Sequence, residues 1–256
     1  MPIAGVLDVF ERHGIPIHCI AGVSAGSIVA AAYASGASPD QIGRAGCAMR
    51  FNDVAGWRLG RMGFVGSERM RRFLGKLLKQ YRFEDMRIPL GIVATDLCTG
   101  EAVNFLGEGD VFLPVRASCS YPGLFRPVSY QGRLLVDGAM VTETPAKLLK
   151  SMGATRVISV HLAGQGADVV PGNMFEVVNR SFQILQTRAE DGWRKYSDIV
   201  LSPSVRTVRW DGFGCGPDLI RAGQAAALDA LPRILAWIEA DRGRVPVEAV
   251  PLGEPA

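Results

Sequence analysis

The pattern of apolar and polar positions predicts helices and strands that alternate along the chain. Apolar residues recur at helical spacing over residues 3–10, and Gly14 and Pro16 predict that this helix ends with a glycine cap. A short apolar run at 17–21 predicts a buried strand, and the small residues of 25–35 predict a second helix. Such alternation is typical of an α/β fold built on a largely parallel sheet.

The pattern continues to the C-terminal region. Ser38 and Pro39 predict a helix start, with serine as the N-cap and proline in the first turn. Further helices are expected from Ser67 and over 144–153, 173–190 and 217–240, and further strands over 88–95, 101–106, 133–136 and 156–161. We find neither a repeat nor a dividing linker. The chain is therefore predicted to form one domain over 1–240, followed by a tail over 241–256.

Composition makes several classes of protein less favoured for this chain. Of the 256 residues, 48% are hydrophobic and 21% charged, as in ordinary soluble globular proteins, and a net charge of +3 is too small to predict nucleic-acid binding. No apolar stretch reaches the ~20 residues that span a bilayer, and no secretory signal is visible. The five cysteines are scattered without a CxxC pair. These features favour a cytoplasmic protein without a metal site, cofactor or disulfide framework.

A candidate nucleophile lies between the first predicted strand and the second helix. The segment 22–26 has the G-x-S-x-G pattern, with Ser24 at its centre. A tight strand-to-helix turn would lift the hydroxyl of Ser24 out of the sheet, and Gly22 and Gly26 would permit the crowded backbone of the turn. The helix start behind Ser24, including the N–H of Ala25, would face a developing oxyanion.

Asp137 is the best candidate for the base that Ser24 needs. It follows the apolar run 134–136 and precedes Gly138, so a strand would deliver it to the edge of the sheet where ligands bind. An ordinary Asp-Gly turn is the alternative interpretation. A Ser-Asp-His triad completed by His161 is disfavoured, because only about one strand fits ahead of Ser24 and because His161 ends an apolar strand.

Together the two motifs resemble the patatin-like phospholipases. Residues 5–16, 94–101 and 117–128 are also similar to segments of that family, so the resemblance covers roughly residues 3–161. It implies a three-layer α/β/α fold and a lipid acyl hydrolase or phospholipase A-type esterase with a catalytic Ser24–Asp137 dyad. Gly22, Ala25, Gly26 and Gly138 would form the elbow and the oxyanion site.

The N-terminal segment departs from this family. Members carry a first strand and a glycine-rich loop before the helix that begins here near Ile3, and the loop supplies most of the oxyanion hole. Losing one such donor typically costs ~10²–10³ in turnover. An upstream coded start, a fragment and a reduced relative are three explanations, and we expect the first. Two other functions stay open: a catalytically impaired lipid-binding or regulatory protein, and a thioesterase or small-ester esterase.

The segment 44–87 is strongly basic, with interleaved apolar residues. Two interpretations stay open: a lid or surface helix that makes peripheral contact with anionic lipid, and a solvated helix face packed on the body of the protein. The basic side chains are those of Arg44, Arg50, Arg58, Arg61, Arg69, Arg71, Arg72, Lys76, Lys79, Arg82 and Arg87.

Overall fold

The structure is a computed structural model that describes residues 1–50, 53, 56–57, 65–66, 68–162, 170–204 and 216–242. Its main sheet is five-stranded, with β4 at the centre because it pairs with β1, β5 and β7, and all seven residues of β4 are buried. The order is β1-β4-β7-β6, and β5 also pairs with β4. The strands are β1 (Ile20–Val23), β4 (Leu90–Asp96), β5 (Ala102–Phe105), β6 (Val128–Tyr130) and β7 (Arg133–Asp137).

The expectation of a largely parallel sheet is wrong in this part of the chain. Only β1 runs parallel to β4, whereas β5 and β7 pair with β4 antiparallel, as β6 does with β7. The connections from β4 to β5 and from β6 to β7 are too short for parallel pairing, since parallel strands need a crossover of a dozen or more residues. Gln131 and Gly132, both with positive φ, join β6 to β7 as a two-residue hairpin turn.

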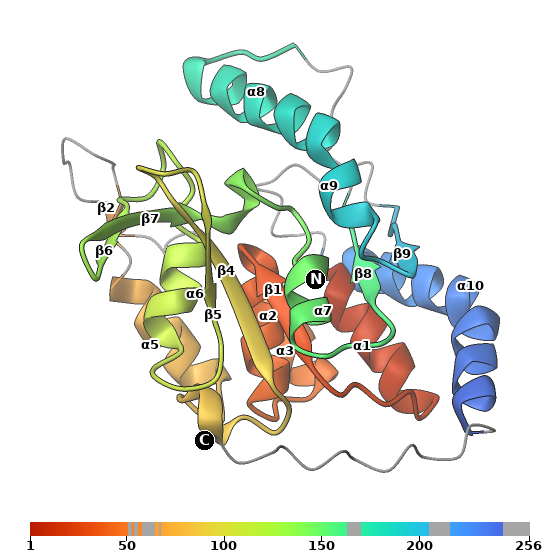
Figure 1. The fold of residues 1–256 in the computed structure, drawn as a ribbon. Coiled ribbons are helices and arrows are strands. Elements are labelled where there is room, and N and C mark those ends of the chain that lie inside the picture. Colours follow the sequence, from red (N-terminus) through yellow and green to blue (C-terminus); the bar gives the residue numbers. More distant parts are fainter. Residues whose placement is uncertain are drawn as a thin grey trace, which may run out of the picture.

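Helices cover both faces of this sheet, so the three-layer arrangement is present (Figure 1). On one face α2 (Ala25–Ala34) and α6 (Phe112–Ser118) contact β4, and its Ile92 joins the largest core there. On the other face Val93 packs with Leu148 of α7 (Ala146–Ser151). Alternate residues of β4 thus enter opposite layers, as the two-residue period of a strand requires.

Two helices that are far apart in the sequence pack closely beside the sheet. Helix α1 (Pro2–Arg12) lies against α10 (Gly216–Arg242), and glycines set their distance. A Cβ on Gly5 would lie 2.1 Å from the carbonyl oxygen of Ile220, and one on Gly223 would lie 1.9 Å from that of Pro2. The two backbones are so close at these positions that neither can hold a side chain. Gly14, with φ 64°, ends the α1 segment as predicted.

The remaining elements surround this body. The elements are α3 (Pro39–Ala48), β2 (Gly56–Trp57), β3 (Val65–Gly66), α5 (Glu68–Leu77), η1 (Phe83–Asp85), η2 (Gly138–Met140), β8 (Ile158–Val160), α8 (Met174–Ala189), α9 (Asp191–Arg194) and β9 (Ile199–Leu201). Strands β8 and β9 form a separate parallel pair. The proposed 241–256 tail lies almost wholly outside the described residues, and α10 continues to Arg242.

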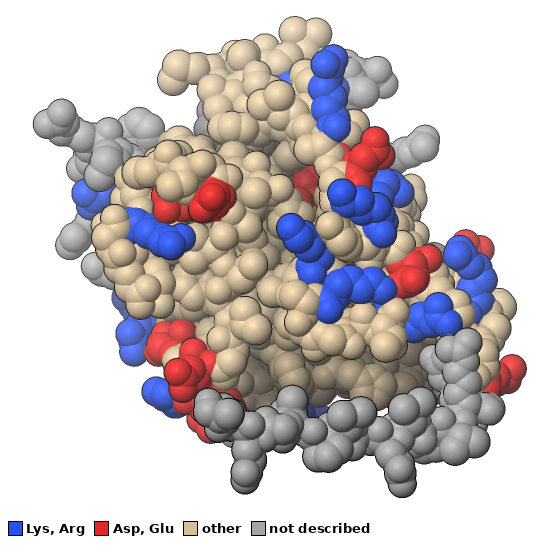
Figure 2. All heavy atoms as spheres, viewed as in Figure 1, with Lys and Arg blue, Asp and Glu red and all other residues tan. Residues whose placement is uncertain are grey.

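Helix α8 stands away from the sheet at the top of Figure 1. Its surface is mostly uncharged in the view of Figure 2, and Met174, Val177 and Leu185 are among its exposed apolar side chains. Among the described residues, none of the helices is both long enough and apolar enough to cross a bilayer.

Candidate active site

Ser24 occupies a tight turn between a strand and a helix. Strand β1 ends at Val23 and α2 begins at Ala25, so Ser24 alone makes the turn, with φ 52° and ψ −131°. Positive φ is uncommon for a residue with a side chain, and such a strained backbone costs about 1–3 kcal/mol. The surrounding structure must therefore hold Ser24 in this conformation.

Close backbone approaches hold the turn, and two of the predicted glycines make them possible. A Cβ on Gly22 would lie 2.4 Å from the carbonyl oxygen of Gly26, and a Cβ on Gly138 would lie 2.2 Å from that of Val93. Gly26 differs, because the nearest atom to its Cβ would be the Cδ1 of Ile3 at 3.7 Å. Steric crowding therefore demands glycine at two of these positions and leaves room for a methyl group at Gly26.

The side chains of Ser24 and Asp137 meet directly. The hydroxyl of Ser24 donates a hydrogen bond of 2.7 Å to Oδ2 of Asp137, across 113 residues of sequence. Asp137 is the last residue of β7, beside the paired strands β4 and β1. Its other oxygen, Oδ1, accepts a 2.9 Å hydrogen bond from the backbone N–H of Ala139. Both carboxylate oxygens thus have defined partners.

Burial changes the acidity of this carboxyl group. Asp137 is 1% exposed, and the loss of solvation raises its pKa from 3.8 to about 6. The hydrogen bonds from Ser24 and from the N–H of Ala139 act in the opposite direction, because they stabilise the carboxylate. An aspartate with a raised pKa is a stronger base than one in water, which suits proton abstraction from a hydroxyl.

Three residues that sequence reasoning did not single out position this pair. The backbone N–H of Ser24 donates to the Oγ of Ser118 at 2.8 Å, and the Thr95 hydroxyl donates to the carbonyl oxygen of Asp137 at 2.9 Å. The N–H of Asp137 donates to the carbonyl of Ser120 at 3.0 Å. The segment 117–128 carried part of the family resemblance, but no pattern within it distinguished Ser118 or Ser120.

The start of α2 offers hydrogen-bond donors next to the hydroxyl. The N–H groups of Ala25 and Gly26 belong to the first turn, where helical N–H groups have no carbonyl partner within the helix. They also lie at the positive end of the helix dipole. Ala25 and Gly26 therefore provide the backbone donors that an oxyanion beside Ser24 would meet.

A cavity of about 1010 Å³ borders Ser24. It lies between β1 and β8, with apolar side chains from α1 and α10 in its wall, among them Ile3, Val6 and Trp237. Within the described part of the chain β1 pairs only with β4, so its other edge faces this cavity.

His161 has other neighbours than the Ser24–Asp137 pair. Its Nε2 lies 3.4 Å from a carboxylate oxygen of Glu143 and 3.7 Å from one of Glu190. The hydroxyl of Ser24 donates to Asp137 instead. The structure thus offers no support for the alternative triad completed by His161.

Tyr121 connects the neighbourhood of Asp137 to α8. Burial and the negative charge of Asp137 raise the pKa of Tyr121 to about 12, so its hydroxyl stays protonated at neutral pH. That hydroxyl donates a 2.8 Å hydrogen bond to the Oδ1 of Asn179 on α8. Gln186 of α8 also donates to the carbonyl of Ala139, two residues after Asp137. Helix α8 is therefore attached to the segment that carries the candidate base.

Comparisons with known proteins find similar sequences. The chain is 27% identical over 213 residues to lysophospholipase NTE1 of Mycosarcoma maydis, and 29% identical over 171 residues to patatin-like phospholipase domain-containing protein 6 of Mus musculus. These matches cover 80% and 63% of this chain but only 11% and 12% of the relatives, so the chain spans a small part of their length.

A solved structure shares the fold, and a sequence profile shows the family. The crystal structure of VipD from Legionella pneumophila matches with a TM-score of 0.51 at 10% identity, over 91% of this chain and 64% of that one, which shows a shared fold. A profile of the patatin-like phospholipases matches residues 3–150, more than half of the chain. The chain therefore belongs to the patatin-like phospholipase family.

Proposed function

We propose that this protein is a serine hydrolase of lipid acyl esters, with Ser24 as nucleophile and Asp137 as general base. The 2.7 Å hydrogen bond between the two side chains is the observation that carries the proposal. The strained turn that exposes Ser24 and the raised pKa of Asp137 support it. Lipid is proposed as the substrate class because several of the similar proteins are named lysophospholipases.

The reaction would proceed through an acyl-enzyme. Asp137 accepts the proton of the Ser24 hydroxyl while Oγ attacks the ester carbonyl carbon, and Asp137 then gives this proton to the departing alcohol as the ester bond breaks. A water molecule next loses a proton to Asp137 and attacks the acyl carbon. The fatty acid leaves, and the proton returns to Oγ of Ser24.

Negative charge on the carbonyl oxygen would be stabilised at the start of α2. The N–H groups of Ala25 and Gly26 would donate to the oxyanion, helped by the positive end of the helix. Gly22 and Gly138 would contribute by allowing the close backbone contacts that fix the turn and the aspartate. A hole built from these donors alone would lack those of the glycine-rich loop, which is the basis of the catalytically impaired alternative.

Substitution of the dyad tests the proposal. Ser24→Ala and Asp137→Asn should each abolish hydrolysis of lysophospholipid while circular dichroism stays unchanged. Ser151→Ala and Asp229→Asn, both at exposed positions, are matched controls that should keep full activity. Hydrolysis that survives either dyad substitution would refute the assignment.

A fluorophosphonate probe separates the enzyme from an impaired lipid-binding relative. The proposal expects covalent labelling at Ser24, and no labelling after Ser24→Ala. A wild-type protein that binds lysolipid but is neither labelled nor active would be the regulatory or lipid-binding alternative. Rates on short esters, acyl thioesters, lysophospholipids and diacyl phospholipids, compared side by side, would distinguish a lipid hydrolase from a thioesterase or small-ester esterase.

We also propose that the basic surface between α3 and α5 contacts anionic lipid. A groove of about 660 Å³ lies there, and the one acidic residue among the described residues of its lining is Asp53. Each basic residue near an anionic membrane contributes about 1 kcal/mol of attraction. The basic side chains of the lining are those of Arg44, Arg69, Arg72, Lys76 and Lys79.

Vesicle binding tests this contact. Arg72→Glu should weaken binding to vesicles with anionic lipid about tenfold or more and leave binding to zwitterionic vesicles unchanged. Arg233→Glu, an equal charge change at an exposed position of α10, is the matched control. Equal loss in both variants would mean that net charge alone is responsible and would contradict the proposed surface.

A further inference from the structure

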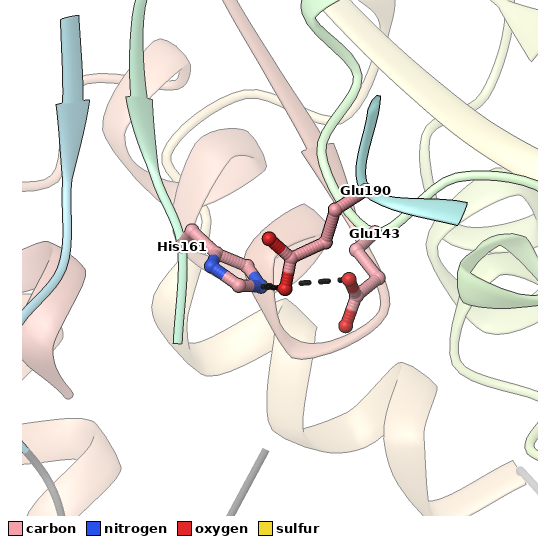
Figure 3. A group of neighbouring side chains, drawn as sticks. All are labelled: Glu143, His161 and Glu190. Carbon is pink, nitrogen blue, oxygen red and sulfur yellow. Dashed lines mark ion pairs between the residues drawn. The ribbon is translucent and has the colours of Figure 1, made fainter. Parts of the chain in front are cut away.

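Three side chains distant in sequence converge beside the cavity, outside the Ser24–Asp137 pair. His161 follows β8, Glu143 follows η2, and Glu190 lies between α8 and α9 (Figure 3). One ring nitrogen of the histidine and one oxygen of each carboxylate lie within 4.8 Å of one another. Glu143 and His161 also line the cavity that borders Ser24.

The histidine is buried without a hydrogen-bond partner. His161 is 4% exposed, and in the described part of the chain neither of its ring nitrogens has a partner. The Oε2 of Glu143, which faces Nε2, is also buried and unpartnered. A buried polar group without a partner costs about 1–3 kcal/mol, and here several such groups point at one place. This arrangement calls for a bound species among them.

The spacing of these atoms fits a metal ion. Zinc binds histidine nitrogen and carboxylate oxygen at about 2.0–2.2 Å in tetrahedral geometry, which places neighbouring ligand atoms about 3.3–3.6 Å apart. The distances from Nε2 are 3.4 Å to Glu143 and 3.7 Å to Glu190, too long for good hydrogen bonds and close to ligand spacing. One imidazole with two carboxylates suits zinc and related transition-metal dications.

The neighbouring contacts leave the proposed ligand atoms available. Glu190 accepts a hydrogen bond from Arg194 through Oε2, whereas Oε1 is the atom that faces His161. The indole ring of Trp193 lies against the imidazole, with ring centroids 5.0 Å apart, and shields this side of the cluster. The carboxylates are 20% and 21% exposed for Glu143 and Glu190, so an ion has a route from solvent.

We propose that Glu143, His161 and Glu190 bind a zinc-class divalent transition metal. The ion would join three segments: the turn after Asp137, the end of β8 and the junction of α8 with α9. Helix α8 stands apart from the sheet in Figure 1, so a metal at its C-terminal end would fix it to the body of the protein. The proposal concerns a structural site and is independent of Ser24 chemistry.

Metal stoichiometry and thermal stability test the site in the full chain. After removal of metals with chelator, the protein is incubated with Zn²⁺, dialysed and measured by elemental analysis. We expect one zinc ion per chain and a Tm higher by several degrees than that of the metal-free protein. Bound Co²⁺ should give the strong visible absorption of a tetrahedral N/O site.

Three nearly isosteric variants locate the ion. Glu143→Gln, His161→Gln and Glu190→Gln should each weaken zinc binding about 100-fold and remove the Tm shift, whereas His13→Gln, at an exposed histidine, should not. Zinc bound equally by all four variants would be held elsewhere, for example by thiols, and would overturn the proposal. So would the absence of zinc binding, which would leave a cluster of His161 with two glutamates and no ion. Fluorophosphonate labelling of Ser24, measured in parallel, reports separately on the proposed hydrolase.

Discussion

As the proposed base, Asp137 would act from a site that disfavours its ionised form. Burial raises its pKa to about 6, and only the carboxylate can accept the proton of Ser24. We therefore expect kcat/KM for a chromogenic ester to rise with pH, with a midpoint near 6, and to level off above pH 7. A midpoint at or below pH 4.5 would contradict a buried Asp137 as the base. The measurement is initial rates between pH 4.5 and 8.

The two glycines on either side of Ser24 should differ in their tolerance of a methyl group. Gly22→Ala would place Cβ 2.4 Å from the carbonyl oxygen of Gly26, so the turn has to shift, and we expect a loss of about 3 kcal/mol in the free energy of unfolding. Gly26→Ala meets only the Cδ1 of Ile3 at 3.7 Å and removes a helical glycine, so its stability should be unchanged or higher. Urea denaturation of both variants measures the difference, and equal losses would contradict it.

At the scale of elements, α5 belongs to the body of the protein. Met70 and Leu74 of this helix are 4% and 0% exposed and join the core that contains β4. None of the described α5 residues lines the cavity at Ser24. The lid interpretation of the basic segment therefore fails for α5, and only its charged face remains for contact with lipid.

Substitution in α5 distinguishes a core helix from a lid. Leu74→Ala should lower the free energy of unfolding by about 2–5 kcal/mol, because it leaves a cavity in the main core. Arg72→Ala, on the exposed face two residues away, should change it by about 0.5 kcal/mol or less. A lid that opens freely would show little loss for either variant, and denaturant unfolding provides the comparison.

The elements that sequence alone predicted are those whose apolar pattern is long or bounded by clear signals. Strand β4 is a continuous buried run, and α3 follows the N-cap Ser38, which forms a capping box with Gln41. Strands β6 and β9 have three residues each, and the apolar pattern predicts neither of them. Strand β1 was predicted at 17–21 but lies at Ile20–Val23, because burial beside β4 and not local apolar character sets its position.

At the scale of the whole molecule, the sequence pattern predicts the two residues of the proposed dyad but not their surroundings. Two motifs in a recognisable order indicated Ser24 and Asp137, because each motif has its own local signal. Ser118 and Thr95 support the pair through single hydrogen bonds set by tertiary packing. Glu143, His161 and Glu190 come from three elements, so no spacing rule for metal ligands applies to them. The direction of strand pairing is likewise a tertiary property, since β4 and β7 are far apart in the sequence and pair antiparallel.

Burial of Asp137 should lower the stability of the whole protein at neutral pH. The folded-state pKa of Asp137, about 6, is above the value of 3.8 for an unfolded chain, so the native state binds more protons between these values. Stability from this group is therefore fully present below pH 4 and is lost as pH rises through 6. The cost at neutral pH is about 3 kcal/mol, since one pKa unit equals about 1.36 kcal/mol.

Asp137→Asn removes this titration from the folding equilibrium. As pH rises from 4 to 7, the free energy of unfolding of the variant should increase by about 3 kcal/mol relative to that of wild type. The variant should also lose ester hydrolysis. Asp229→Asn, at an exposed position of α10, should give a curve parallel to that of wild type. Denaturant unfolding across this pH range is the measurement, and parallel curves for all three proteins would mean that Asp137 is not destabilised by burial. A gain confined to Asp137→Asn would show that the same loss of solvation that makes this carboxylate basic also lowers the stability of the fold.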